Sequence, residues 1–110
     1  MKIAIPTAGG LLCAHFGHCE KFAMFEVSDG SIVGMYWLNP PPHEQGALPR
    51  FLKTEGTKVI ISGGMGLKAQ KFFEEFGITV VTGAPSLEPE EVVRRYLSGA
   101  LVTGENVCDH

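Results

Sequence analysis

A short loop near the N-terminus combines two cysteines with two histidines, namely Cys13, His15, His18 and Cys19. Thiolate and imidazole are the ligands that softer transition metals prefer. Gly17 stands between the two histidines, and glycine lets several donor groups converge without backbone strain. The loop therefore indicates a metal site. One by one, however, the cysteines are equally well explained as small buried apolar residues and the histidines as surface polar groups.

The remaining cysteine and histidines lie in two distant segments. His43 follows a run of three prolines, and Cys108 and His110 close the sequence. Every cysteine and histidine therefore falls in a predicted loop or terminal segment, which favours a shared site. The alternative for the last residues is that they are frayed. No C-x-x-C pair is present, so the spacing does not choose among zinc, iron and an iron-sulfur cluster.

A glycine-rich turn is the second candidate binding element. Gly63, Gly64 and Gly66 lie between an apolar run and a helical pattern, where backbone N–H groups at a helix N-terminus could hold an anion. Glycine also has no Cβ, so a bulky anionic cluster could approach the backbone. The turn loosely matches a dinucleotide fingerprint, but no acidic residue ends the next strand and no phosphate-loop lysine follows. A tight strand-to-helix turn is the plain structural alternative.

Features that would support catalysis are sparse. Ser62 has no nucleophile elbow around it. The paired glutamates fall on predicted helix surfaces, where solvated charge explains them. We therefore do not expect an enzyme.

Composition and charge fit a single soluble domain over residues 1–110. Hydrophobic residues make up 45% and charged residues 19% of the chain, which is enough apolar material for a core. The formal net charge is −3, whereas nucleic acids and acidic membranes require a basic face. No apolar stretch approaches the roughly 18 residues of a membrane-spanning helix, and Pro6 interrupts the apolar start before a signal peptide could form. We expect a cytoplasmic protein without nucleic-acid or membrane partners.

Hydrophobic periodicity predicts the elements that must position these residues. Five strands are expected, over residues 2–6, 21–28, 32–38, 59–61 and 78–81. A long loop over residues 7–20 separates the first two strands, and Asp29-Gly30 predicts a tight hairpin between the second and third. A helix follows each of the last three strands, and these helices end at Gly56, Gly77 and Gly99.

This order, β-β-β-α-β-α-β-α, predicts an α/β fold with a mixed, mostly parallel five-stranded sheet and an antiparallel hairpin at one edge. The first, third, fourth and fifth strands should run in the same direction. The loops after them then open at one edge of the sheet, where ligands bind in open α/β folds. Residues 100–110 could extend about 30 Å, twice the rise of about 15 Å of the preceding helix, so Cys108 and His110 could return to this edge.

Four motifs together resemble the dinitrogenase iron-molybdenum cofactor biosynthesis family, which includes NifX-like small proteins and the C-terminal domain of NifB. They are His15-Phe16-Gly17, Pro42-His43-Glu44-x-Gly46, Ser62-Gly63-Gly64-Met65-Gly66 and Cys108-x-His110. The resemblance runs over essentially the whole chain. It implies a ribonuclease-H-like three-layer fold without nuclease activity, and binding of an iron-sulfur or iron-molybdenum-type cluster or its precursor.

The resemblance also implies site residues. It carries over His15, His43, Cys108 and His110 as metal ligands, with the glycine turn as a backbone cradle. The assignment of Cys13, His18 and Cys19 to the site rests on their chemistry and proximity alone. On this basis we expect a metal-cluster carrier whose partner is a cluster donor or recipient protein.

Two other classes of function stay open at this point. One is a thiol-redox or metal-dependent enzyme that uses Cys13 or Cys19 and would need a depressed thiol pKa. The other is a cofactor-free interaction or regulatory module that presents residues 40–46 to a partner. The sequence does not predict the cluster type, the partner or the oligomeric state.

Overall fold

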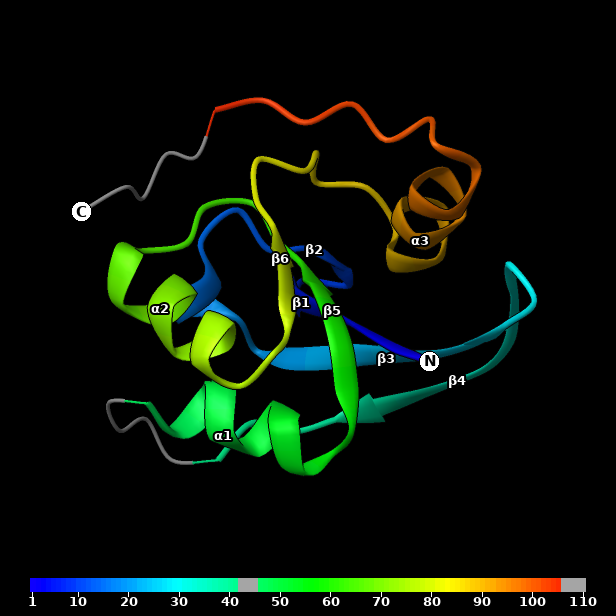
Figure 1. Ribbon diagram of the computed structural model, residues 1–110. Coiled ribbons are helices and arrows are strands. Elements are labelled where there is room, and N and C mark those ends of the chain that lie inside the picture. The colour runs from blue at the N-terminus through cyan, green and yellow to red at the C-terminus, as the bar shows by residue number, and fades with distance from the viewer. Residues whose placement is uncertain (42–45, 106–110) are drawn as a thin grey trace.

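The fold is built around a mixed β-sheet with helices on both faces (Figure 1). The computed structural model describes residues 1–41 and 46–105. Its strands are β1 (Lys2–Ala8), β2 (Leu11–Leu12), β3 (Lys21–Ser28), β4 (Ser31–Leu38), β5 (Thr57–Ile61) and β6 (Thr79–Val81). Its helices are the 3-10 helix η1 (Phe16–His18) and the α-helices α1 (Ala47–Thr54), α2 (Leu67–Glu75) and α3 (Pro89–Ser98).

Two short elements lie where we expected loop throughout residues 7–20. Strand β2 pairs antiparallel with the end of β1, through Thr7 with Leu12 and Ala8 with Leu11. The 3-10 helix η1 follows three residues later. The expectation of a loop throughout residues 7–20 is therefore wrong for the residues of β2 and η1. Elements of two or three residues are too short to show periodicity, so they depend on neighbours that are close only in the folded chain.

The described strands form a six-stranded sheet in the order β4-β3-β1-β5-β6, with β2 paired to β1 off this path. Strand β3 lies between β1 and β4 and is antiparallel to both. Strand β5 is parallel to β1, and β6 is parallel to β5. The mixed α/β sheet and the antiparallel direction of β3 are therefore as predicted. The number of five strands is wrong, because β2 adds a strand. With that pair, antiparallel pairings outnumber parallel ones among the described strands, so the sheet is not mostly parallel.

Strand directions nevertheless place the loops as predicted. Strands β1, β4, β5 and β6 run in the same direction, so the segments that follow them open at one edge of the sheet, which we call the carboxyl edge. The predicted hairpin is also present between β3 and β4. Asp29 and Gly30 both adopt positive φ, at 53° and 74°, as the two central residues of a type I′ turn require.

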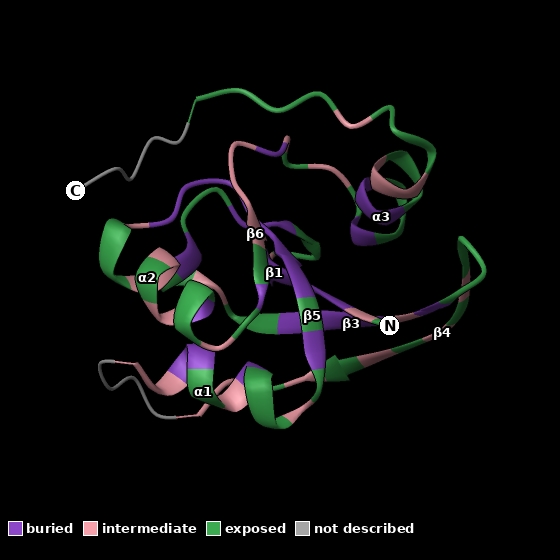
Figure 2. Cartoon of the chain, in the orientation of Figure 1, coloured by how far each residue is buried: buried purple, intermediate pink, exposed green. Residues whose placement is uncertain are grey.

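Residues that alternate along the sheet divide the core into two clusters. Figure 2 shows the buried stretches of the chain in purple, which include much of the central strands and parts of the helices that pack on them. On one face, Ile3 and Ile5 of β1 are buried with Val92 of α3. On the other face, Ala4 is buried with Leu52 of α1 and with α2. The molecule therefore has three layers, with α3 on one side of the sheet and α1 and α2 on the other.

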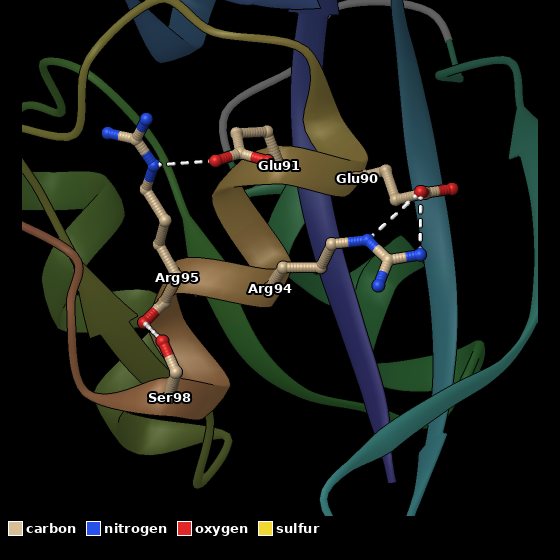
Figure 3. Close-up of polar contacts among 5 residues, drawn as sticks. All are labelled: Glu90, Glu91, Arg94, Arg95 and Ser98. Carbon is tan, nitrogen blue, oxygen red and sulfur yellow. Dashed lines mark hydrogen bonds and ion pairs between the residues drawn. The ribbon is translucent and has the colours of Figure 1, made fainter.

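The outer surface of α3 carries two exposed ion pairs (Figure 3). Arg94 lies 2.8 Å from Glu90, and Arg95 lies 2.8 Å from Glu91, each pair one helical turn apart. Solvent screens such pairs, so each contributes only about 0.3–0.5 kcal/mol. The hydroxyl of Ser98 donates to the carbonyl of Arg95 at 3.1 Å in the last turn. These contacts support the helix that leads into the C-terminal segment. None of the described helices is long and apolar enough to cross a membrane.

Candidate functional site at the carboxyl edge

The loop after β2 is anchored to the core by Phe16. Its side chain is buried, at 6% exposure, although both histidines beside it are exposed. The ring packs edge-on against Phe73 of α2 with centroids 5.6 Å apart, and lies 6.3 Å from the ring of Phe22 in β3. One buried aromatic residue thus fixes a segment that presents His15 and His18 to solvent.

The two imidazoles of this segment lie close together. The ring centroids of His15 and His18 are 5.7 Å apart, with the ring planes tilted by 51°. Metal–nitrogen bonds are about 2 Å long, so two imidazoles on one ion have centroids at a similar separation. The spacing of the two imidazoles is therefore compatible with both binding one metal ion.

The two cysteines of the loop differ from the histidines in exposure. Cys13 is buried, and its Sγ donates a hydrogen bond to the backbone carbonyl of His15 at 2.9 Å. Cys19 is half-buried, and burial, followed by the charge of Cys13, raises the pKa of its thiol to about 11. At neutral pH Cys19 is therefore a protonated thiol. A thiol-redox enzyme needs the opposite shift, so this environment does not favour Cys19 as a redox nucleophile.

The glycine turn after β5 docks directly on the loop. The N–H of Gly63 donates to the carbonyl of Cys13 at 3.3 Å, the N–H of Gly64 donates to the carbonyl of Ala14, and the N–H of Phe16 donates to the carbonyl of Gly64 at 2.8 Å. A Cβ on Gly63 would lie 2.6 Å from the Ala14 oxygen, so only glycine permits this approach. Since the N–H groups of Gly63 and Gly64 already have backbone acceptors, they hold the loop in place rather than standing open to an anion. Of the predicted cradle, Gly66 at the start of α2 has no such contact to the loop among the described backbone hydrogen bonds.

Two further backbone segments complete the carboxyl edge. The N–H of Gly83, just after β6, donates to the carbonyl of Gly63 at 2.6 Å. The N–H of Gly104, in the segment after α3, donates to the carbonyl of Gly83 at 2.7 Å. Cys13, Gly63, Gly83 and Gly104 therefore mark four chain segments that follow one another across the edge. Figure 1 shows the C-terminal segment crossing above the loops, from the side of α3 towards that of α2.

The structure brings together part of the predicted site. Cys13, His15, His18 and Cys19 share one loop, and Gly63 and Gly64 contact it. His43, Cys108 and His110 lie outside the described residues. Within residues 1–41 and 46–105, no three His, Cys, Asp or Glu side chains are grouped closely enough to hold a metal ion. Among the described residues, the candidate site therefore consists of a loop held in place by the glycine turn and of the two imidazoles of His15 and His18.

Sequence reasoning missed three residues that build this edge. Phe16 belongs to one of the four motifs, but its place in the core is not predicted, because a single apolar residue in a loop shows no periodicity. Gly83 lies two residues after the end of a predicted strand, where a glycine can mark a close backbone approach. Gly104 has no local signal, because its role depends on contact with Gly83, which is distant in sequence.

A family model described as "Dinitrogenase iron-molybdenum cofactor" matches residues 1–99. The chain belongs to this family. The resemblance identified from the four motifs is thereby confirmed at the level of the family. The match ends at Gly99, so Gly104, Cys108 and His110 lie beyond the residues that it covers.

The chain is also similar to proteins of known sequence or structure. The uncharacterized protein MJ0580 of Methanocaldococcus jannaschii is 32% identical over 106 residues, covering 92% of this chain and 89% of the relative. The crystal structure of PH0822 superposes with a TM-score of 0.89 at 28% identity, covering 96% of each chain. The apo form of the orange protein from Desulfovibrio gigas gives a TM-score of 0.76 at 21% identity, covering 96% of this chain and 93% of that one. At that identity the last comparison shows a shared fold.

Proposed function

We propose that this protein binds an iron-sulfur or iron-molybdenum-type cluster, or a precursor of one, and carries it between a donor and a recipient protein. The observation that carries the proposal is the meeting of the His15–His18 loop, the glycine turn and the C-terminal segment at the carboxyl edge. Membership of the dinitrogenase iron-molybdenum cofactor family supports the choice of cluster as the class of cargo. A ribonuclease-H-like architecture and a cytoplasmic location belong to the same proposal.

The chemistry of the donor set fits such a cargo. Imidazoles from His15, His43 and His110 and the thiolate of Cys108 would ligate iron or molybdenum, and His18 lies beside His15. Cys13 and Cys19 stay candidates in the same loop. In the described structure neither thiol is readily available to a metal, because Cys13 is buried and burial raises the pKa of Cys19.

Release is as important to a carrier as binding. A set of four thiolates in a rigid knuckle favours permanent retention, whereas mixed histidine and cysteine ligation from separate segments favours exchange. Here the exposed imidazoles are presented on the surface of a loop whose backbone is fixed by Phe16 and the glycine turn. A loop with a fixed backbone and few strong metal ligands would favour transfer of the cluster to a partner protein.

The test is anaerobic reconstitution with iron and sulfide, followed by measurement of both elements per chain. The double variant His15→Ala, His18→Ala should retain several-fold less iron than the wild type while unfolding at the same temperature, because both side chains are exposed. Lys58→Ala, an exposed change within β5, is the matched control and should retain wild-type iron. Equal retention by the double variant and the control would contradict the assignment of this loop.

A further inference from the structure

The outer strand β4 leaves one edge of the sheet open. It pairs with β3 on one side, and none of the described strands lies on its other side (Figure 1). Its residues, Ser31–Leu38, include no charged residue and no proline, which are two of the means by which an edge strand avoids pairing with another chain. On one face β4 carries an exposed apolar row, because Val33, Met35 and Trp37 are 62%, 41% and 46% exposed. The backbone and the side chains of β4 therefore suit the addition of a further strand.

A groove of about 370 Å³ lies on the same face of the sheet as this row. Its apolar walls are formed by Met35 and Trp37 of β4, Phe25 of β3, Leu11 of β2 and Pro89 of α3. The volume is at the lower end of the range of about 300–1,000 Å³ that is usual for binding sites. The groove can therefore accommodate a small number of apolar side chains.

The charged residues that line the groove are both acidic, namely Glu88 and Glu90. Glu90 is paired with Arg94 at 2.8 Å. Within residues 1–41 and 46–105, the carboxylate of Glu88 has no hydrogen-bond or ion-pair partner, so it is available to a basic side chain. A second copy of this chain that paired through β4 would present a strand with no basic residue. The charge of the groove therefore favours a different protein as the occupant.

The groove adjoins the loop that carries the two imidazoles. Leu11 is the first residue of β2, which leads into this loop. The N–H of Leu12 donates to the carbonyl of Leu87 at 2.9 Å, and this bond ties β2 to the segment before α3. Trp37 lies near the end of β4, which is at the carboxyl edge. A segment bound in the groove would bring its protein to the edge that presents the imidazoles.

We propose that the groove and the open edge of β4 bind an extended segment of the protein that gives or receives the cluster. This inference rests on the proposed function, because it concerns the partner of the same carrier. The segment would add a strand to β4, so that main-chain hydrogen bonds supply affinity and alternate side chains supply specificity. Its apolar side chains would pack on Met35 and Trp37, and a basic side chain would pair with Glu88.

The experiment uses a synthetic peptide as long as β4, in which valine alternates with threonine and each end carries a lysine. A second peptide carries glutamate at both ends and is otherwise identical. Trp37 is the only tryptophan of the chain, so its fluorescence reports binding in the groove and needs no cargo. Hydrogen–deuterium exchange of the β4 amides reports whether the peptide pairs with the open edge.

The lysine peptide should shift the Trp37 emission in a saturable way and protect amides of β4 from exchange. The glutamate peptide should bind about fivefold more weakly, which is the effect of an exposed ion pair, and Glu88→Lys should reverse this preference. Met35→Lys should abolish binding of both peptides, because it places a charge in the apolar wall. Val102→Lys is the matched control, since Val102 is 81% exposed outside the groove and this variant adds the same charge. It should bind both peptides as the wild type does.

Several results would overturn the proposal. They are absence of saturable binding by the lysine peptide, binding without protection of β4, an unchanged preference in Glu88→Lys, and an equal loss of binding in Val102→Lys. A wild-type dimer in sedimentation that Met35→Lys abolishes would show that a second copy occupies the edge, and the proposal would be wrong. If the peptide does not bind but the protein takes up iron, the proposed function stands without this inference. A wild-type protein that takes up no iron contradicts the proposed function, and the inference falls with it.

Discussion

Substitution of Gly63 by alanine would test how the loop that carries His15 and His18 is held. The new Cβ would lie 2.6 Å from the Ala14 oxygen and 2.8 Å from both the Ala14 Cα and the Cys13 oxygen. These are backbone atoms, which cannot rotate away as a flexible side chain could. The loop must therefore move off the turn, and the hydrogen bonds between the two segments, including the 2.8 Å bond from Phe16 to Gly64, would be strained or lost.

The magnitude of the effect follows from these contacts. Overpacking of a close approach costs about 1–3 kcal/mol, and each strained backbone hydrogen bond adds about 0.5–1.5 kcal/mol. We expect Gly63→Ala to lower the free energy of unfolding by about 3 kcal/mol. For a domain of this size that corresponds to a fall in melting temperature of roughly 10–15 °C.

The assay is urea and thermal unfolding followed by circular dichroism, with Gly17→Ala as the matched control. Gly17 lies in the same loop, and a Cβ added to it would meet no heavy atom within 4 Å. We expect Gly17→Ala to change stability by less than about 0.5 kcal/mol. If both variants lose the same stability, or if neither does, the loop is not held by close approach to the turn and the reasoning is wrong.

Two other predictions concern the cysteines. Alkylation of Cys19, measured by mass spectrometry of the peptide that carries it, should stay slow at neutral pH and rise with pH up to a midpoint near 11; a midpoint near the ordinary value of 9.0 would refute the burial that raises its pKa. Because the folded pKa is the higher one, the folded chain holds this proton more tightly than the unfolded chain, so Cys19 contributes stability below pH 9 that is lost as pH rises towards 11. Cys108→Ser should lower iron retention after reconstitution without changing the melting temperature, and unchanged metal stoichiometry would exclude the tail thiol as a ligand.

Local patterns predicted much of the sheet and its helices. A continuous apolar run over residues 22–25 marked β3, and Asp29-Gly30 placed the hairpin, because both signals act between residues close in sequence. The short strand β2 could not be predicted in this way, since it exists only through pairing with the end of β1. The antiparallel direction of β3 followed from the predicted hairpin, whereas the antiparallel pair of β1 with β2 was missed along with β2 itself.

The position of the candidate loop could be predicted from the sequence, whereas the contacts that hold the loop could not. The residue types of the loop pointed to metal ligands, and strand directions placed the loop at the carboxyl edge. That Gly63 and Gly64 bind the loop backbone depends on contacts across about fifty residues of chain, which no local pattern encodes. The burial of Cys13 likewise depends on tertiary packing. Residue type alone therefore suggested a thiol that is accessible to a metal, whereas the thiol of Cys13 is buried in the structure.

Elemental and acid-labile sulfide analysis of protein purified without oxygen tests the carrier function most directly. Exclusion of oxygen matters, because a weakly held cluster would be lost in air. We predict iron together with a matching amount of sulfide, with or without molybdenum, in the purified or anaerobically reconstituted protein. Zinc alone, or no iron uptake even after reconstitution, would contradict the proposal that this chain carries a metal-sulfur cluster.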